Sequence, residues 1–243
     1  MSSPVPPLRP TISVQLGARA PADKEAAARR KAELAAVADA APWRASWLLH
    51  APHRLGFFLA SCVLVLASLW WALVQLDRST GWLALPSVIS PTLVHSAVMA
   101  FGFIPLFFSG FLFTAGPKWL GVEAPLAKDL RVPLFSLAAG WLLWLAGAHL
   151  HAGVAWAGLA LAMVGLVWMT VQFWGRIRRS QAEDQLHARV IGTACVVGCV
   201  SLAGLVLSVV FEAHATARAW IFTGLWGFVV VVYVTVAHRM IPF

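Results

Sequence analysis

The stretch HSAVMAFGFIPLFFSGFLFTAGPKW, residues 95–119, decides the fold of this chain. It is almost wholly apolar, and together with the residues just before it is long enough to cross a bilayer, which takes about 20 residues of α-helix. Yet it opens with a histidine and carries a proline in its middle. The stretch predicts a membrane-spanning helix that keeps a titratable, metal-capable side chain.

The composition of the whole chain agrees with a membrane location. Of its 243 residues, 60% are hydrophobic and only 12% are charged, whereas a soluble domain carries about 25% charged residues. The formal net charge of +8 sits in a tail and in short loops, so it indicates attraction to the lipid bilayer and not nucleic-acid binding. We predict an all-α polytopic membrane helix bundle.

Six apolar segments are long enough to span the membrane. We expect spans at about 55–76, 90–115, 132–150, 153–175, 190–211 and 218–240. Residues 1–54 form a separate Pro-, Ala- and charge-rich tail, with a short helix in its second part and an interfacial lead-in at 43–54. The membrane domain is then 55–243. Small residues four apart, such as Gly158 with Ala162, predict close helix packing.

The basic residues set the orientation. Sixteen of the 18 Lys and Arg residues fall on one side of the predicted spans and two on the other. Because cytoplasmic loops carry the excess of Lys and Arg, both termini are predicted to be cytoplasmic. Asp, Glu, Lys and Arg are missing from the predicted span interiors, which argues against an ion-coupled carrier with midplane carboxylates. Likewise, no phosphate-binding loop or HExxH motif is found.

This orientation sorts the histidines into two levels. His95 falls in the outer third of its span, and His149 and His151 fall at the outer end of the span at 132–150. His53 and His238 lie at cytoplasmic helix ends, each followed by an arginine. The other histidines, His50, His187 and His214, fall in loops or the lead-in and are expected to be solvated.

His95 is the first candidate ligand. An ionisable group inside a span costs roughly 2.5–3.5 kcal/mol when charged, and a neutral imidazole still needs a hydrogen-bond partner or a metal. Met99, Gly102, Leu106 and Ser109 follow at helical spacing on the same face. Such a strip can receive a haem macrocycle, and imidazole with thioether also suits copper.

Other interpretations of the same span stay open. The small residues of that face can serve only to let a neighbouring helix pack closely, with His95 in an interhelical hydrogen bond. Pro105 predicts a kink, and transporters use such breaks. The cysteines, Cys62, Cys195 and Cys199, all lie in apolar runs and predict neither a disulfide nor a thiolate metal site.

The motifs of three segments resemble those of the NnrS family of bacterial membrane proteins. Residues 95–121 match its histidine-initiated span, with Gly102-Phe103, Gly110-Phe111-Leu112 and a Thr-Ala-x-Pro-x-Trp end at 114–119. PHRLGFF at 52–58 is similar to the family's entry into its first span. RMIPF at 239–243 is similar to the exit from its sixth.

The resemblance implies a haem- and copper-containing inner-membrane protein linked to nitric oxide metabolism and nitrosative stress. It makes His95 a metal or haem ligand, with Met99 beside it, and places His53, His238 and Arg239 at matching motif positions. His149 and His151 are weaker metal candidates. Many relatives read His-x-His-Glu where this chain reads His95-Ser96-Ala97-Val98.

Relatives also carry about twice as many spans, so we expect a half-length or truncated member. Two alternatives are kept: a cytochrome b-like electron-transfer protein, and a non-haem transporter or assembly scaffold. No catalytic acid, base or nucleophile can be named from the sequence.

Overall fold

The computed structural model describes residue 29 and residues 44–241. The chain divides into two compact units, residues 1–44 and residues 45–243, and the second unit holds the helices described below. The short helix predicted in the tail lies, apart from residue 29, outside the described residues. So do Pro242 and Phe243 of the C-terminal motif.

The described part of residues 45–243 is helical and contains no strand. A 3-10 helix, Ala45–Leu49, precedes the bundle. The single-helix spans are α2 (Pro52–Thr80), α5 (Ala127–Leu150), α6 (Ala152–Arg179) and α7 (Leu186–Val210). The other two spans are composite. In the first, α3 (Pro91–Val98) continues through a π-helical turn, Met99–Phe103, into α4 (Ile104–Leu120). In the second, α8 (His214–Gly224) continues through a π-helical turn, Leu225–Val230, into α9 (Val231–Met240).

The prediction of six spans is confirmed, since six helical segments among the described residues are long and apolar enough to cross a membrane. The helices are longer than the predicted spans at most ends, because the helical hydrogen bonds continue past the apolar residues into the interface. Arg78 and Lys118 accordingly lie in the last turns of α2 and α4. His214, predicted in a loop, is instead the first residue of α8.

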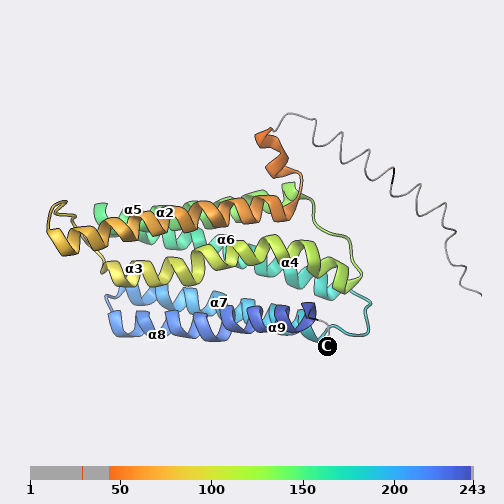
Figure 1. Ribbon diagram of the computed structural model, residues 1–243. Coiled ribbons are helices and arrows are strands. Elements are labelled where there is room, and N and C mark those ends of the chain that lie inside the picture. Colours follow the sequence, from red (N-terminus) through yellow and green to blue (C-terminus); the bar gives the residue numbers. More distant parts are fainter. Residues whose placement is uncertain (1–28, 30–43, 242–243) are drawn as a thin grey trace, which may run out of the picture. The chain divides into compact units, whose positions relative to one another are not determined.

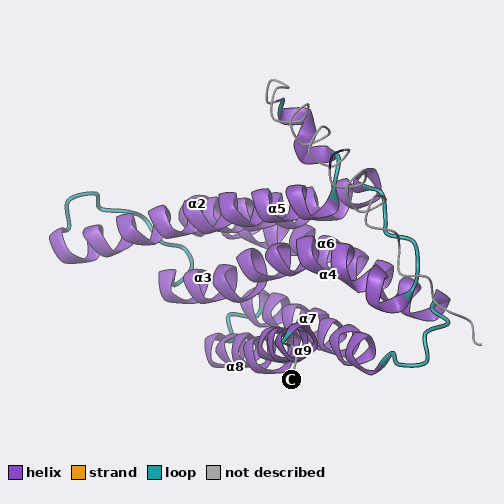
Figure 2. Ribbon diagram, turned by 45° about the vertical axis from the view of Figure 1, so that its right-hand side comes forward, coloured by secondary structure: helices purple, strands orange, loops and turns teal. Residues whose placement is uncertain are grey.

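The six spans form two layers of three (Figures 1 and 2). One layer holds α2, the composite span α3–α4 and the composite span α8–α9, and the other holds α5, α6 and α7. Contacts join α2 to α5, α4 to α6, and α7 to both α8 and α9. We call the end where α3, α6 and α8 begin the outer end, following the predicted orientation, and the opposite end the inner end.

The α5–α6 pair is packed most closely, as the small residues predict. A Cβ added to Gly140 would lie 2.6 Å from the carbonyl oxygen of Gly158 and 2.5 Å from the backbone nitrogen of Ala162. A Cβ on Gly158 would lie 2.6 Å from the nitrogen of Trp144. Backbones this close leave no room for a side chain, so these glycines set the spacing of the two helices.

The π-helical turn at Met99–Phe103 changes the face that the span presents. The strip from His95 through Ser109 was predicted from a regular helix, but only its first two members stay together. Gly102 faces Trp141 of α5, since an added Cβ would lie 3.0 Å from that ring, and Ser109 is buried against Gly56 of α2. The extra residue that a π-helical turn accommodates rotates all later residues about the axis. That rotation is why the strip is interrupted.

Candidate functional site

His95 lies on α3, in the outer half of the composite span, with its ring stacked on Trp71 of α2. The two ring centroids are 4.3 Å apart and the planes are within 12° of parallel. Arg78, two turns further along α2, holds its guanidinium carbon 5.4 Å from the centroid of Trp71. Trp71 therefore fixes the plane of the imidazole, and a cation–π contact supports Trp71 in turn.

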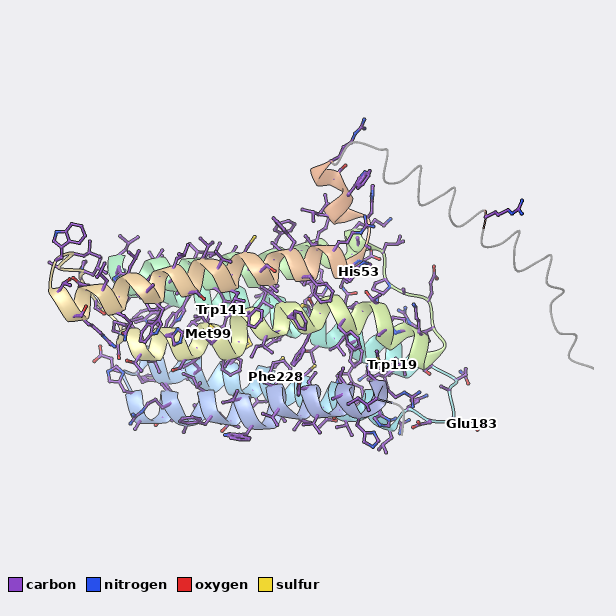
Figure 3. All side chains as sticks on the ribbon, viewed as in Figure 1. His53, Met99, Trp119, Trp141, Glu183 and Phe228 are labelled. Atoms are coloured by element: carbon purple, nitrogen blue, oxygen red, sulfur yellow. The ribbon has the colours of Figure 1, made fainter. Side chains whose placement is uncertain are left out.

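A cavity of about 300 Å³ opens beside this imidazole, between α3 and α8. His95 and Met99 line it from one span, and Arg218, Phe222 and Leu225 line it from the other. Both π-helical turns contribute to its wall, through Met99 and Leu225. π-Helical turns of this kind often occur at functional sites. Figure 3 labels Met99 on the composite span α3–α4.

The Nδ1 atom of His95 is buried and has no hydrogen-bond partner among the described residues. A buried polar atom without a partner costs about 1–3 kcal/mol. The described residues hold five other such side-chain atoms, on His53, Trp141, Arg176, His187 and Ser201, but none of these residues lines the cavity. Of these six residues, His95 is therefore the one whose side chain also lines the cavity.

A second cavity of about 450 Å³ adjoins the first at the outer end. Ser96 and Arg218 line both cavities, and Ser90, Thr92 and His214 line only the outer one. More of the residues that line the outer cavity carry polar side chains than of those that line the inner cavity. We call the two together the α3–α8 groove.

The other outer histidines are engaged in the fold. The Nδ1–H of His149 donates to the carbonyl of Pro86 at 2.5 Å, and its Nε2 accepts from the indole N–H of Trp70 at 2.7 Å. His151 caps α6, accepting at Nδ1 from the backbone N–H of Gly153 at 3.0 Å. The prediction that these two histidines bind a metal stays a prediction, and at His149 it requires one of the two bonds to break.

The motif residues at the inner end form a separate polar cluster. His238 faces His187 across α9 and α7, with Nδ1 of the former 3.0 Å from Nε2 of the latter. Arg239 forms an ion pair with Asp184 at 3.2 Å. The backbone N–H of Leu186 donates to the Asp184 carboxylate and lowers its pKa, and the charge of Arg239 acts in the same direction.

His53 lies at the inner end of α2, away from the region of Met99 (Figure 3). Its carbonyl oxygen would be 3.2 Å from a Cβ added to Gly110, so α2 and α4 are in close contact there. Its Nδ1 is buried without a partner among the described residues. In Figures 1 and 2 α4 lies between α2 and α9, so the structure keeps His53 and His238 on separate helices and does not pair them.

Of the predicted ligands, the structure thus brings together His95 and Met99, and it joins neither to the inner-end residues. Sequence reasoning missed Trp71, Arg218 and Phe222, which come from other spans. One signal was available for Arg218: it is one of two basic residues on the predicted outer side. No signal in the sequence pairs it with His95, because nothing local relates the faces of spans two and six.

No group of three or more His, Cys, Asp or Glu side chains that could hold a metal ion is found in the described part of the chain. A metal at His95 would therefore take its other ligands from outside that set, such as the Met99 thioether or the nitrogens of a macrocycle.

Comparison with known families gives one result. The family model described as NnrS protein matches residues 47–243, which include all six spans and the α3–α8 groove. Comparisons with curated proteins and with solved structures gave no match. Because the match extends over far more than half of the chain, this six-span membrane protein belongs to the NnrS family.

Proposed function

We propose that this protein binds haem in the α3–α8 groove, with His95 as a ligand to the iron, and that it acts in the bacterial response to nitric oxide. The observation that carries the proposal is the unpartnered Nδ1 of an imidazole that lines a cavity inside a membrane span. Haem iron commonly takes a neutral histidine as its protein ligand. Membership of the NnrS family supports the link to nitric oxide.

The residues of the groove fit such a group. The two cavities, about 300 and 450 Å³, are each within the usual range for small-molecule sites, about 300–1,000 Å³. The stack on Trp71 fixes the imidazole plane, and Met99 offers a thioether on the same wall. A bound haem would supply an iron centre for a diatomic ligand or for electron transfer. The chain itself supplies orientation and a largely apolar wall.

The visible spectrum of the detergent-purified protein, expressed with ample haem, tests the proposal. We expect a Soret band in the wild type, and its loss or shift in His95→Ala, because the iron ligand is removed. His50→Ala is the matched control, since His50 is exposed beside the 3-10 helix and lines neither cavity. A folded wild type without a Soret band, or a band unchanged by His95→Ala, would contradict the proposal.

Copper is a second metal that the same wall suits, because Met99 and His95 offer soft and borderline ligands. Metal analysis of the same sample measures it. Met99→Leu removes the thioether while keeping the side-chain volume. If copper is held there, its content falls in this variant while the thermal stability is retained. An unchanged copper content would show that Met99 is not a copper ligand and that copper binds elsewhere in the protein.

A further inference from the structure

The α3–α8 groove changes chemistry along its length. Its inner part is lined by Met99, Ile104, Phe222 and Leu225, and its outer part by three hydroxyl groups, His214 and the apolar Leu93. Arg218 lines both parts and so stands at the junction. A groove that is apolar at depth and polar at the rim fits a ligand with an apolar body and a polar edge.

The basic residues of the outer side gather at this junction. Arg78 and Arg218 are the only two of the 18 Lys and Arg residues that fall on the predicted outer side. Arg78 donates from Nη2 to the hydroxyl of Thr92 at 3.2 Å, and Thr92 lines the outer cavity. Basic residues are strongly biased toward the cytoplasmic side of membrane proteins, yet both of these arginines lie near the rim of one groove.

In the part of the chain that the structure describes, no anionic side chain pairs with Arg218. Among the described residues no hydrogen bond or ion pair of its side chain is found, and neither cavity is lined by an acidic residue. Asp77, an acidic residue of the same end, accepts instead from the backbone N–H groups of Leu83 and Leu85, both at 3.0 Å. Glu212, which is close to Arg218 in sequence, forms no ion pair with Arg218 among the described residues. The guanidinium therefore remains available to a ligand.

We infer that Arg218 binds the anionic group of the molecule in the groove, and that this group is a carboxylate on the edge of a porphyrin. A planar guanidinium recognises a carboxylate through two parallel hydrogen bonds, better than an ammonium does. Arg78, bonded to Thr92 of the outer cavity, adds positive charge beside it. The inference rests on the proposed function and names the recognition residue of that site.

The test compares two porphyrins that differ only at their two propionate groups: iron protoporphyrin IX, which carries two carboxylates, and its dimethyl ester, which carries none. Titration of the purified apo-protein gives both affinities. We expect the wild type to prefer the diacid by about tenfold, the size of a charge-assisted hydrogen bond. Arg218→Gln should lower affinity for the diacid about tenfold and leave affinity for the ester within about twofold. Arg218→Lys should keep part of the preference.

Arg131→Gln is the matched control, because Arg131 is exposed at the inner end of α5 and lines neither cavity. It should retain the full preference of the wild type for the diacid. His95→Ala should weaken both porphyrins equally. If the wild type binds both porphyrins through His95 but without preference, or if Arg218→Gln weakens both alike, the assignment of Arg218 is overturned and the haem proposal stands. A wild type that binds neither overturns both.

A lipid phosphate is the other anion that Arg218 could hold at this depth. The titrations are therefore repeated in vesicles of phosphatidylcholine and in vesicles with added phosphatidylglycerol. If the carboxylate is the ligand, the preference for the diacid persists in both. A preference that disappears in the phosphatidylglycerol vesicles would show that headgroups occupy the rim, and would overturn the assignment.

Discussion

At the scale of single residues, the outer histidines His95 and His149 show that the same type of side chain can have two different environments. His149 has a partner at each ring nitrogen, Pro86 and Trp70. Because a carbonyl can only accept, Nδ1 of His149 carries the proton, and the imidazole joins α2, the following loop and α5. His95 has a stacking partner but a buried nitrogen without a hydrogen bond. In the proposed function this imidazole is the one that binds a ligand.

The role of His149 in the fold can be measured through its donor. Trp70→Phe removes the indole N–H and leaves Nε2 of His149 without its partner, at a cost of about 1 kcal/mol, or roughly 2–4 °C in melting temperature for a chain of this size. Thermal unfolding in detergent measures the shift. Trp82→Phe is the control, because Trp82 is 78% exposed. Equal shifts in the two variants would argue against the hydrogen bond.

At the scale of helices, two structural features position the residues of the groove. Glycines bring α5 and α6 into backbone contact and make a rigid layer, and π-helical turns in the two composite spans adjust which side chains face the groove. The first feature was predictable from small residues at four-residue spacing. The second was not, because a single extra residue per turn leaves almost no mark on hydropathy.

The glycine contact predicts a clear contrast between two alanine variants. Gly140→Ala places a methyl group within 2.6 Å of backbone atoms of α6, so we expect it to destabilise the protein by about 1–3 kcal/mol, as overpacking does. Gly175→Ala meets nothing within 4 Å and should be neutral or stabilising by up to about 1 kcal/mol. Thermal unfolding of both variants measures this difference in stability. Similar melting temperatures would contradict the close approach.

At the scale of the whole molecule, the bundle has two chemically distinct ends. The outer end holds the α3–α8 groove, with His95 and Arg218. The inner end holds the paired His187 and His238 and the ion pair between Asp184 and Arg239. This separation agrees with the two histidine levels expected from topology, and it adds a contact between His187 and His238 that the sequence did not predict.

The orientation of these ends follows from the distribution of basic residues and can be tested by labelling. In a background with the three cysteines replaced by alanine, we expect Trp82→Cys to react with a membrane-impermeant maleimide in intact cells whose outer membrane is permeabilised. Glu183→Cys should react only after lysis. Both positions are exposed; Trp82 follows the outer end of α2, and Glu183 lies between α6 and α7 at the inner end. The reverse pattern would invert the topology and place the groove on the cytoplasmic side.

The sequence by itself determined the all-α class, the six spans, their predicted direction and the candidacy of His95. These depend on hydropathy, charge and motif, which are properties of short segments, and each can be evaluated without knowing its neighbours. The longer helix ends and the start of α8 at His214 lay beyond this reasoning, because hydropathy marks the apolar interior and not where helical hydrogen bonds stop.

Only the tertiary structure decided which side chains meet. It brought Arg218 to the cavity of His95 across 123 positions of sequence, stacked Trp71 on the imidazole, and joined His187 to His238. It also turned Gly102 and Ser109 away from the predicted strip. Within a bilayer, helix association depends on close packing and on polar contacts between faces, and not on hydrophobicity. A face is matched to its neighbour only when the whole bundle forms.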